Sequence, residues 1–146
     1  MLGYGVENWA LKDVTVTTPI AGVQVLHYPT RGIRQRFRGI HVTFTTDATV
    51  ATRKIWLVAL GQTWAMPVRV SPYTQAASLS FEYVFVADGE DSDAAYDAAT
   101  RTVRVGHELW MDYMHGLSVF AVNIAATDAF TVCKLRVLEA IMPGEF

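Results

Sequence analysis

The chain has four histidines and a short acidic segment, and these side chains are potential metal ligands, so metal binding is considered first. Four potential ligands lie close together in the segment HELWMDYMH, namely His107, Glu108, Asp112 and His115. Their spacing is not the H-E-x-x-H pattern that puts two zinc ligands on one helix face. The acidic segment DGEDSD at 88–93 lacks glycine and glutamate where an EF-hand loop requires them. We predict a strand and turn at the first segment, a solvated loop at the second, and no metal or other cofactor.

Catalysis has no recognisable motif in this sequence. The chain contains no G-x-S-x-G motif, no phosphate-binding loop and no paired-carboxylate motif. Its one cysteine, Cys133, alternates in phase with Leu135 and Val137. We therefore predict a buried thiol that acts as a small hydrophobic side chain, no catalytic residue and no enzymatic activity.

Two features indicate binding. Aromatic rings displayed on a sheet can stack against sugar rings, so one hypothesis is a glycan- or receptor-binding module that uses Trp64 and Trp110. Charge is also segregated, with basic and acidic runs that contain Arg31, Arg34, Arg36 and Arg38, and Asp88, Glu90, Asp91 and Asp93. Arginine forks could bind these carboxylates between neighbouring copies of the chain. The alternative, two solvated loops, stays open because an exposed ion pair contributes only about 0 to 1 kcal/mol.

Composition limits the class of protein. A chain of 146 residues fits one domain with its own core, which we predict at 14–146 after an N-terminal arm at 1–13. The hydrophobic fraction of 51% is high and the charged fraction of 18% is low, which favours a surface that meets a partner. The net charge of -2 argues against nucleic-acid binding. No apolar run is long enough to cross a bilayer and no signal peptide is evident, so we expect a soluble protein without a membrane partner.

Alternation of polar and apolar residues is the dominant pattern and predicts an all-β protein. We expect nine strands at 14–17, 21–28, 37–46, 53–60, 63–70, 77–86, 102–111, 116–124 and 130–141. Short connections favour antiparallel neighbours. The longest connection, 88–101, is predicted to carry a short helical turn after Ser92 as N-cap. Eight or nine such strands favour a two-sheet antiparallel sandwich of jelly-roll type, with an up-and-down barrel as the competing fold.

The strand RKIWLVAL at 53–60 is apolar on both faces. One face carries Ile55 and Leu57, and the opposite face carries Trp56, Val58 and Leu60. A monomer seldom exposes a large contiguous apolar patch. We therefore predict that the Trp56 face packs against a second layer or against another chain.

A Thr-Asp-Ala turn occurs twice, each time between the end of one strand and the start of the next. It appears in FTTDATVATRK at 44–54 and in AATDAFTVCK at 125–134. Asp47 and Asp128 can each accept a hydrogen bond from a backbone N–H two residues on. We predict two Asx-turns with a structural role.

Three patterns in the region from residue 40 to residue 140 carry a family resemblance. A strand ending in Thr-Thr-x-Ala-Thr-Val-Ala at 45–51 leads to an apolar strand headed by Arg53. A Gln-Ala-Ala segment at 75–77 precedes the aromatic strand of 81–85, and Asn-x-x-x-x-Asp-x-Phe at 123–130 precedes the last strand. In these patterns the chain resembles small structural proteins encoded among the virion genes of tailed bacteriophages.

The resemblance implies a jelly-roll protein of the virion, assembled in the host cytoplasm. We expect a capsid decoration or cement protein that binds the major capsid protein, or other virion proteins, as a homo-oligomer such as a trimer. The partner-binding residues would be Trp56 together with the arginines and acidic residues of the two charged runs. A head-tail connector or tail component is the remaining alternative within this setting.

Overall fold

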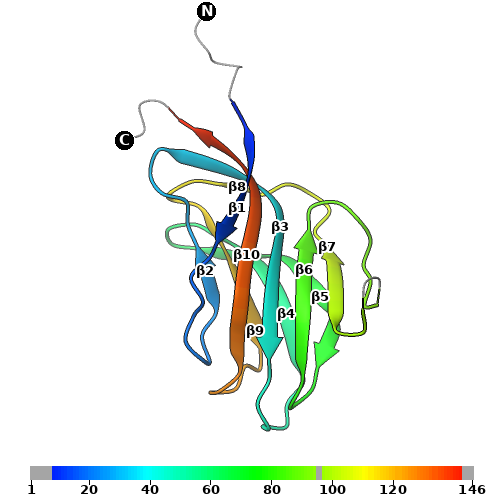
Figure 1. Cartoon of the computed structure of the whole chain (residues 1–146). Helices are drawn as coiled ribbons and strands as arrows, with labels where there is room; N and C mark the ends of the chain where they lie inside the picture. Colours follow the sequence, from blue (N-terminus) through cyan, green and yellow to red (C-terminus); the bar gives the residue numbers. More distant parts are fainter. Residues whose placement is uncertain (1–7, 95–96, 143–146) are drawn as a thin grey trace, which may run out of the picture.

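The computed structural model describes residues 8–94 and 97–142, and within them the chain forms two β-sheets packed face to face and no helix (Figure 1). Sheet A has the order β1-β10-β3-β6-β7 with β8 beside β3, and contains β1 (Ala10–Thr15), β3 (Ile33–Thr45), β6 (Ser80–Val86), β7 (Thr100–Arg104), β8 (Trp110–Met111) and β10 (Ala129–Ile141). Sheet B has the order β2-β9-β4-β5 and contains β2 (Val25–His27), β4 (Arg53–Leu60), β5 (Ala65–Gln75) and β9 (Gly116–Val122). The predicted all-β sandwich is confirmed.

The core lies between the two sheets and is built from alternate residues of each strand. Sheet A contributes aromatic rings, among which Phe44 and Phe130 have centroids 4.6 Å apart. Sheet B contributes aliphatic side chains that include Ile55 and Leu57, both fully buried. Branched and aromatic side chains fit a pleated, half-covered surface, so the same residues that favour strands also fill the core. Cys133 is buried in this core, as predicted, and burial raises the pKa of its thiol to about 11.

The prediction of antiparallel neighbours is wrong for one pair, because β6 and β7 run parallel. The connection 87–99 between them is the longest connection between two strands, and it is long enough for the crossover that a parallel pair requires. The helical turn predicted after Ser92 does not begin at residues 93–94, and residues 95–96 lie outside the described residues. Ser92 instead forms an antiparallel bridge with Thr102, which places this connection beside the outer edge of β7.

Glycines at positive φ explain two differences between predicted and observed strands. Gly106 has φ of 88° and follows the end of β7, so the predicted strand 102–111 is two strands, β7 and β8. Gly22 has φ of 77°, and the predicted strand 21–28 shortens to β2. At the N-terminal end, β1 begins at Ala10, inside the segment predicted as an arm, and residues 1–7 of that segment lie outside the described residues. The strand predicted at 53–60 has the bounds of β4.

Candidate interaction surface

The outer face of sheet B carries an apolar surface. Residues paired across neighbouring strands share a face, and Trp56 of β4 pairs with Phe120 of β9 and with Val70 of β5. One step along the sheet, Val58 pairs with Ser118 and Pro67. We call this surface the sheet B face, and its apolar members are Leu26, Trp56, Val58, Leu60, Ala65, Pro67, Val70, Phe120 and Val122.

The sheet B face points away from the core. Ile55 and Leu57 belong to the core cluster, whereas Trp56 and Phe120 lie outside that cluster and are half-buried. The Trp56 and Phe120 rings pack against each other with centroids 5.4 Å apart. Lys54 is the charged residue of this face and lies at one end of it, paired with Val122 and Thr74. The prediction that β4 is apolar on two opposite faces is confirmed; that a partner covers the Trp56 face stays a prediction.

Arg36 and Arg38 form ion pairs within the chain. The Arg36 guanidinium donates to both carboxylate oxygens of Glu108, with Nη2 2.7 Å from Oε1 and Nε 3.2 Å from Oε2. Arg38 lies 3.5 Å from Glu108 and 3.7 Å from the highly exposed Asp88. One contact between the basic and acidic runs is therefore intramolecular. Arg31 lies over the Tyr113 ring, 5.2 Å from its centroid, and Arg34 lies on β3.

The acidic run lies along the edge of sheet A. Asp91 accepts a hydrogen bond from the backbone N–H of Arg104, at 2.9 Å, and forms an ion pair with Arg69 of sheet B. The hydrogen bond from Arg104, together with the Arg69 guanidinium, lowers the pKa of Asp91 below its usual range. Glu90 and Asp93 are exposed in the same connection. Part of this run therefore joins the two sheets and the rest faces solvent.

Trp64 and Trp110 have different surroundings. The Trp110 ring meets the Trp9 ring edge to face, with centroids 5.5 Å apart, and the Arg36 guanidinium lies 5.0 Å from the Trp110 centroid. Trp64 lies in the hairpin between β4 and β5, with its ring centroid 6.2 Å from that of His115. The structure therefore gives no single site that contains both tryptophans.

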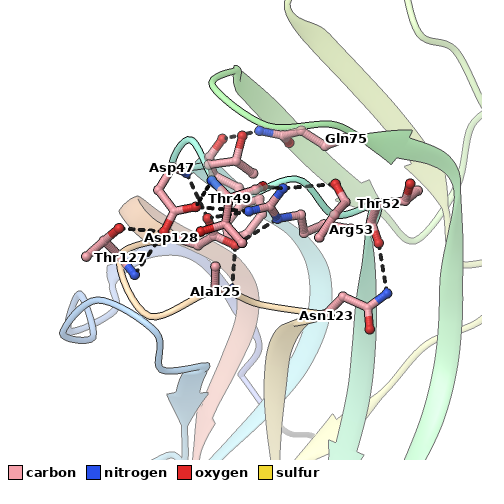
Figure 2. A network of polar contacts seen from close by, with 12 residues as sticks. Asp47, Thr49, Thr52, Arg53, Gln75, Asn123, Ala125, Thr127 and Asp128 are labelled. Atoms are coloured by element: carbon pink, nitrogen blue, oxygen red, sulfur yellow. Dashed lines mark hydrogen bonds and ion pairs between the residues drawn. The ribbon is translucent and has the colours of Figure 1, made fainter.

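A buried ion pair was missed by the sequence analysis (Figure 2). Arg53 and Asp128 are both fully buried, and their side chains are joined by two hydrogen bonds of 2.9 and 3.0 Å. The Arg53 guanidinium also donates to Asp47 and to the backbone oxygens of Thr49 and Ala51. These contacts use all five N–H donors of the arginine, as burial of its charge requires.

The same network links the two Thr-Asp-Ala turns. Asp47 Oδ1 accepts the Thr49 N–H, so the predicted Asx-turn at Asp47 is confirmed. Asp128 acts differently, because its carboxylate accepts the Ala125 N–H within its own turn and the Asp47 N–H across the end of the sandwich. Hydrogen bonds from Thr127 and Thr49 lower the pKa of Asp47 far below its usual range. The two copies of the turn are thus hydrogen-bonded to each other and link the β3–β4 connection to the β9–β10 connection.

A groove of about 700 Å³ lies on the outer face of sheet A, across β1, β10, β3 and β6. Its lining includes Gly39 and Val84 together with the charged residues Arg38, Lys134 and Asp13. Within 8–94 and 97–142, no three His, Cys, Asp or Glu side chains are grouped as metal ligands. The described residues also contain no helix able to span a membrane.

Comparison with known proteins gives no matching family model, no similar curated protein and no similar solved structure. The grounds for a functional proposal are therefore the surfaces described above and the resemblance seen in the sequence.

Proposed function

We propose that this chain is a non-enzymatic structural protein of a tailed-bacteriophage virion, a capsid decoration protein that binds the capsid surface as a homo-oligomer. The observation that carries the proposal is the sheet B face. On this apolar face Leu26 and Pro67 are exposed, Trp56 and Phe120 are half-buried, and Lys54 lies at one end. A partly exposed apolar face of this kind is typical of a surface that meets another protein.

The size of the face favours several copies that bind together. The face spans about seven residues of β4, β5 and β9 and the three residues of β2, and at about 3.3 Å per residue and 4.8 Å between strands this gives a flat area of roughly 300 to 400 Å². This is about half of the roughly 800 Å² that each partner contributes to a standard interface. One such contact is weak. In an oligomer bound to a repeating capsid lattice, the first contact raises the effective concentration of the other copies at their sites, so the oligomer binds more tightly than one copy does.

The virion setting rests on the resemblance of residues 40–140 to phage structural proteins. A two-sheet sandwich is compatible with the jelly-roll type that this resemblance implies, and we include that type in the proposal. The parallel β6–β7 pair is a departure from the antiparallel arrangement expected of it.

The test uses a charge placed at the centre of the sheet B face. Trp56→Lys should abolish binding of the purified protein to capsids of the encoding phage that lack it, measured by co-sedimentation, because the buried lysine would have no partner. Thr43→Lys is the matched control, since it adds the same charge to the outer face of sheet A, where Thr43 pairs with Glu82.

Light scattering of the free protein tests the oligomer separately from the capsid. If the Trp56→Lys variant binds capsids as well as the native chain does, the proposed use of this face is contradicted. A protein that binds no capsid at any salt concentration would contradict the virion role. A contact made by the charged runs would weaken as salt rises, since exposed charges are screened beyond about 8 Å at physiological ionic strength.

A further inference from the structure

Trp64 is held in place by a glycine. A Cβ added at Gly61 would lie 2.1 Å from both Nε1 and Cε2 of Trp64 and 2.7 Å from Cδ1. A point equally close to two bonded ring atoms, and nearly as close to a third, lies above the plane of the five-membered ring. Gly61 therefore packs against one flat face of the indole, and the Gly61 N–H donates to the Trp64 backbone oxygen at 2.9 Å. Trp64 is 49% exposed, so about half of the residue is open to solvent.

A second aromatic ring and a turn contact the hairpin that carries Trp64. The Tyr28 hydroxyl donates to the Gly61 oxygen at 3.3 Å, and the Tyr28 ring lies against Gly116, where a Cβ would come within 2.8 Å of it. The Gln62 amide donates to the Met114 oxygen at 3.4 Å and links the hairpin to the turn at 112–115. These contacts hold the backbone at Gly61 and the turn that carries His115 before any ligand arrives, which lowers the entropy lost on binding.

His115 supplies a directed polar atom beside the ring. Its Nδ1 lies 2.8 Å from the Asp112 carboxylate, which also accepts the backbone N–H groups of Met114 and His115. A carboxylate can only accept, so Nδ1 carries a proton and Nε2 of the neutral ring is left as an acceptor. Burial pushes the pKa of Asp112 up, but the hydrogen bond from His115 and those from the backbone outweigh it and keep this pKa below its usual value. The His115 side chain is 48% exposed and can meet a ligand.

We propose that Trp64 and His115 form a saccharide-binding site at this end of sheet B. The C–H groups of a pyranose ring would stack on the exposed face of Trp64, because the face of an aromatic ring is electron-rich and C–H groups are weakly positive. A sugar hydroxyl would donate to His115 Nε2. Trp110 is not part of this site, because its ring is already engaged by Arg36 and Trp9.

The described contacts of Trp64 favour a neutral sugar over a nucleic acid. Sites that stack nucleic-acid bases combine aromatic rings with lysine or arginine that bind the phosphates. The contacts described for Trp64 involve Gly61 and His115 and no lysine or arginine. A single rigid ring with one adjacent acceptor matches the size of one sugar ring, whereas a protein partner requires a larger continuous surface.

Titration of the full chain, followed through the indole N–H signals of its four tryptophans, tests the site. The probes are the methyl β-pyranosides of glucose, galactose and N-acetylglucosamine, and oligosaccharides of each. We expect the Trp64 signal to shift with at least one of these sugars. Trp64→Ala should weaken binding about tenfold or more, in line with the effect of removing one stacking ring. Trp110→Ala, which removes a ring of similar exposure, should leave the affinity unchanged.

Gly61→Ala tests the geometry without removing the ring. Its φ is not positive, so alanine fits the backbone, but the new methyl group must displace the Trp64 indole. We expect sugar binding to fall while the circular dichroism spectrum stays the same. Unchanged affinity in Trp64→Ala or in Gly61→Ala, or no shift of the Trp64 signal with any probe, would overturn the proposal. Because the sheet B face is not altered, these results do not depend on capsid binding.

Discussion

Replacement of Asp128 by alanine should be among the most destabilising single changes in the chain. The carboxylate accepts four hydrogen bonds, two from Arg53 and one each from the backbone of Asp47 and Ala125. Alanine would leave the fully buried Arg53 with only Asp47 as a charged partner, and two backbone N–H groups without their acceptor. The β3–β4 and β9–β10 connections would lose their shared contact at the same time.

The expected loss is about 3 to 5 kcal/mol, the cost of removing one partner from a buried ion pair. Each orphaned backbone N–H adds about 1 kcal/mol or more, which favours the upper end of that range. Domains of this kind are stable by about 5 to 15 kcal/mol, so the variant should be folded but marginal. Its melting temperature should fall by about 10 °C or more.

Urea unfolding followed by tryptophan fluorescence measures this loss, with Asp88→Ala as the control at a highly exposed aspartate. The control should change the free energy of unfolding by no more than about 0.5 kcal/mol. The double variant Arg53→Met with Asp128→Leu should be more stable than Asp128→Ala alone, because the fully buried guanidinium is then removed together with its buried partner. A loss below about 1 kcal/mol for Asp128→Ala, or a double variant that is the less stable of the two, would refute the interpretation.

Three further predictions concern single residues. The hydrogen bond from Thr127 helps to lower the pKa of Asp47, so the stabilisation that this carboxylate provides is present above about pH 4 and is lost as the pH falls towards the folded-state pKa. Asp47→Asn should therefore lose less stability than the native chain between pH 7 and pH 3. An equal loss in urea titrations of the two proteins would contradict this. Cys133, buried and with its pKa raised to about 11, should react with a thiol reagent at pH 8 at least about a hundredfold more slowly in the native protein than in urea, and fast native labelling would disprove its burial. Gly116→Ala should cost about 1 to 3 kcal/mol in a thermal melt, since the new Cβ would come within 2.1 Å of the His27 oxygen; no change would show that β2 moves freely.

The strands were predictable where alternation is strict and the core decides the register. At 53–60 the alternate burial of Ile55 and Leu57 defines β4 from end to end. Alternation failed at 102–111, because Gly106 turns the chain without a break in the apolar pattern. The parallel β6–β7 pair was equally hidden, since a long acidic connection has the same composition whether it is a solvated loop or a crossover.

The buried ion pair shows a different limit. Arg53 and Asp128 are 75 positions apart, and an arginine at the head of an apolar strand is also compatible with a solvent-exposed strand end. The repeated Thr-Asp-Ala turn was the available signal, but two similar turns do not indicate that they touch. Asp47 and Asp128 meet because β3 and β10 are paired neighbours in sheet A, which only the sheet order reveals.

The sheet edges explain why association through a face is favoured over association through an edge. An exposed edge strand can pair with another chain unless its backbone groups are covered or its strand carries proline. The edge of β7 is covered, because Ser92 bridges Thr102 and Asp91 accepts the Arg104 N–H. β5 carries Pro67 and Pro72, which lack the N–H that strand pairing requires. With the β5 and β7 edges blunted, we expect the proposed partner to meet the sheet B face, and a charge at Trp56 is the substitution that separates association through this face from association through those two edges.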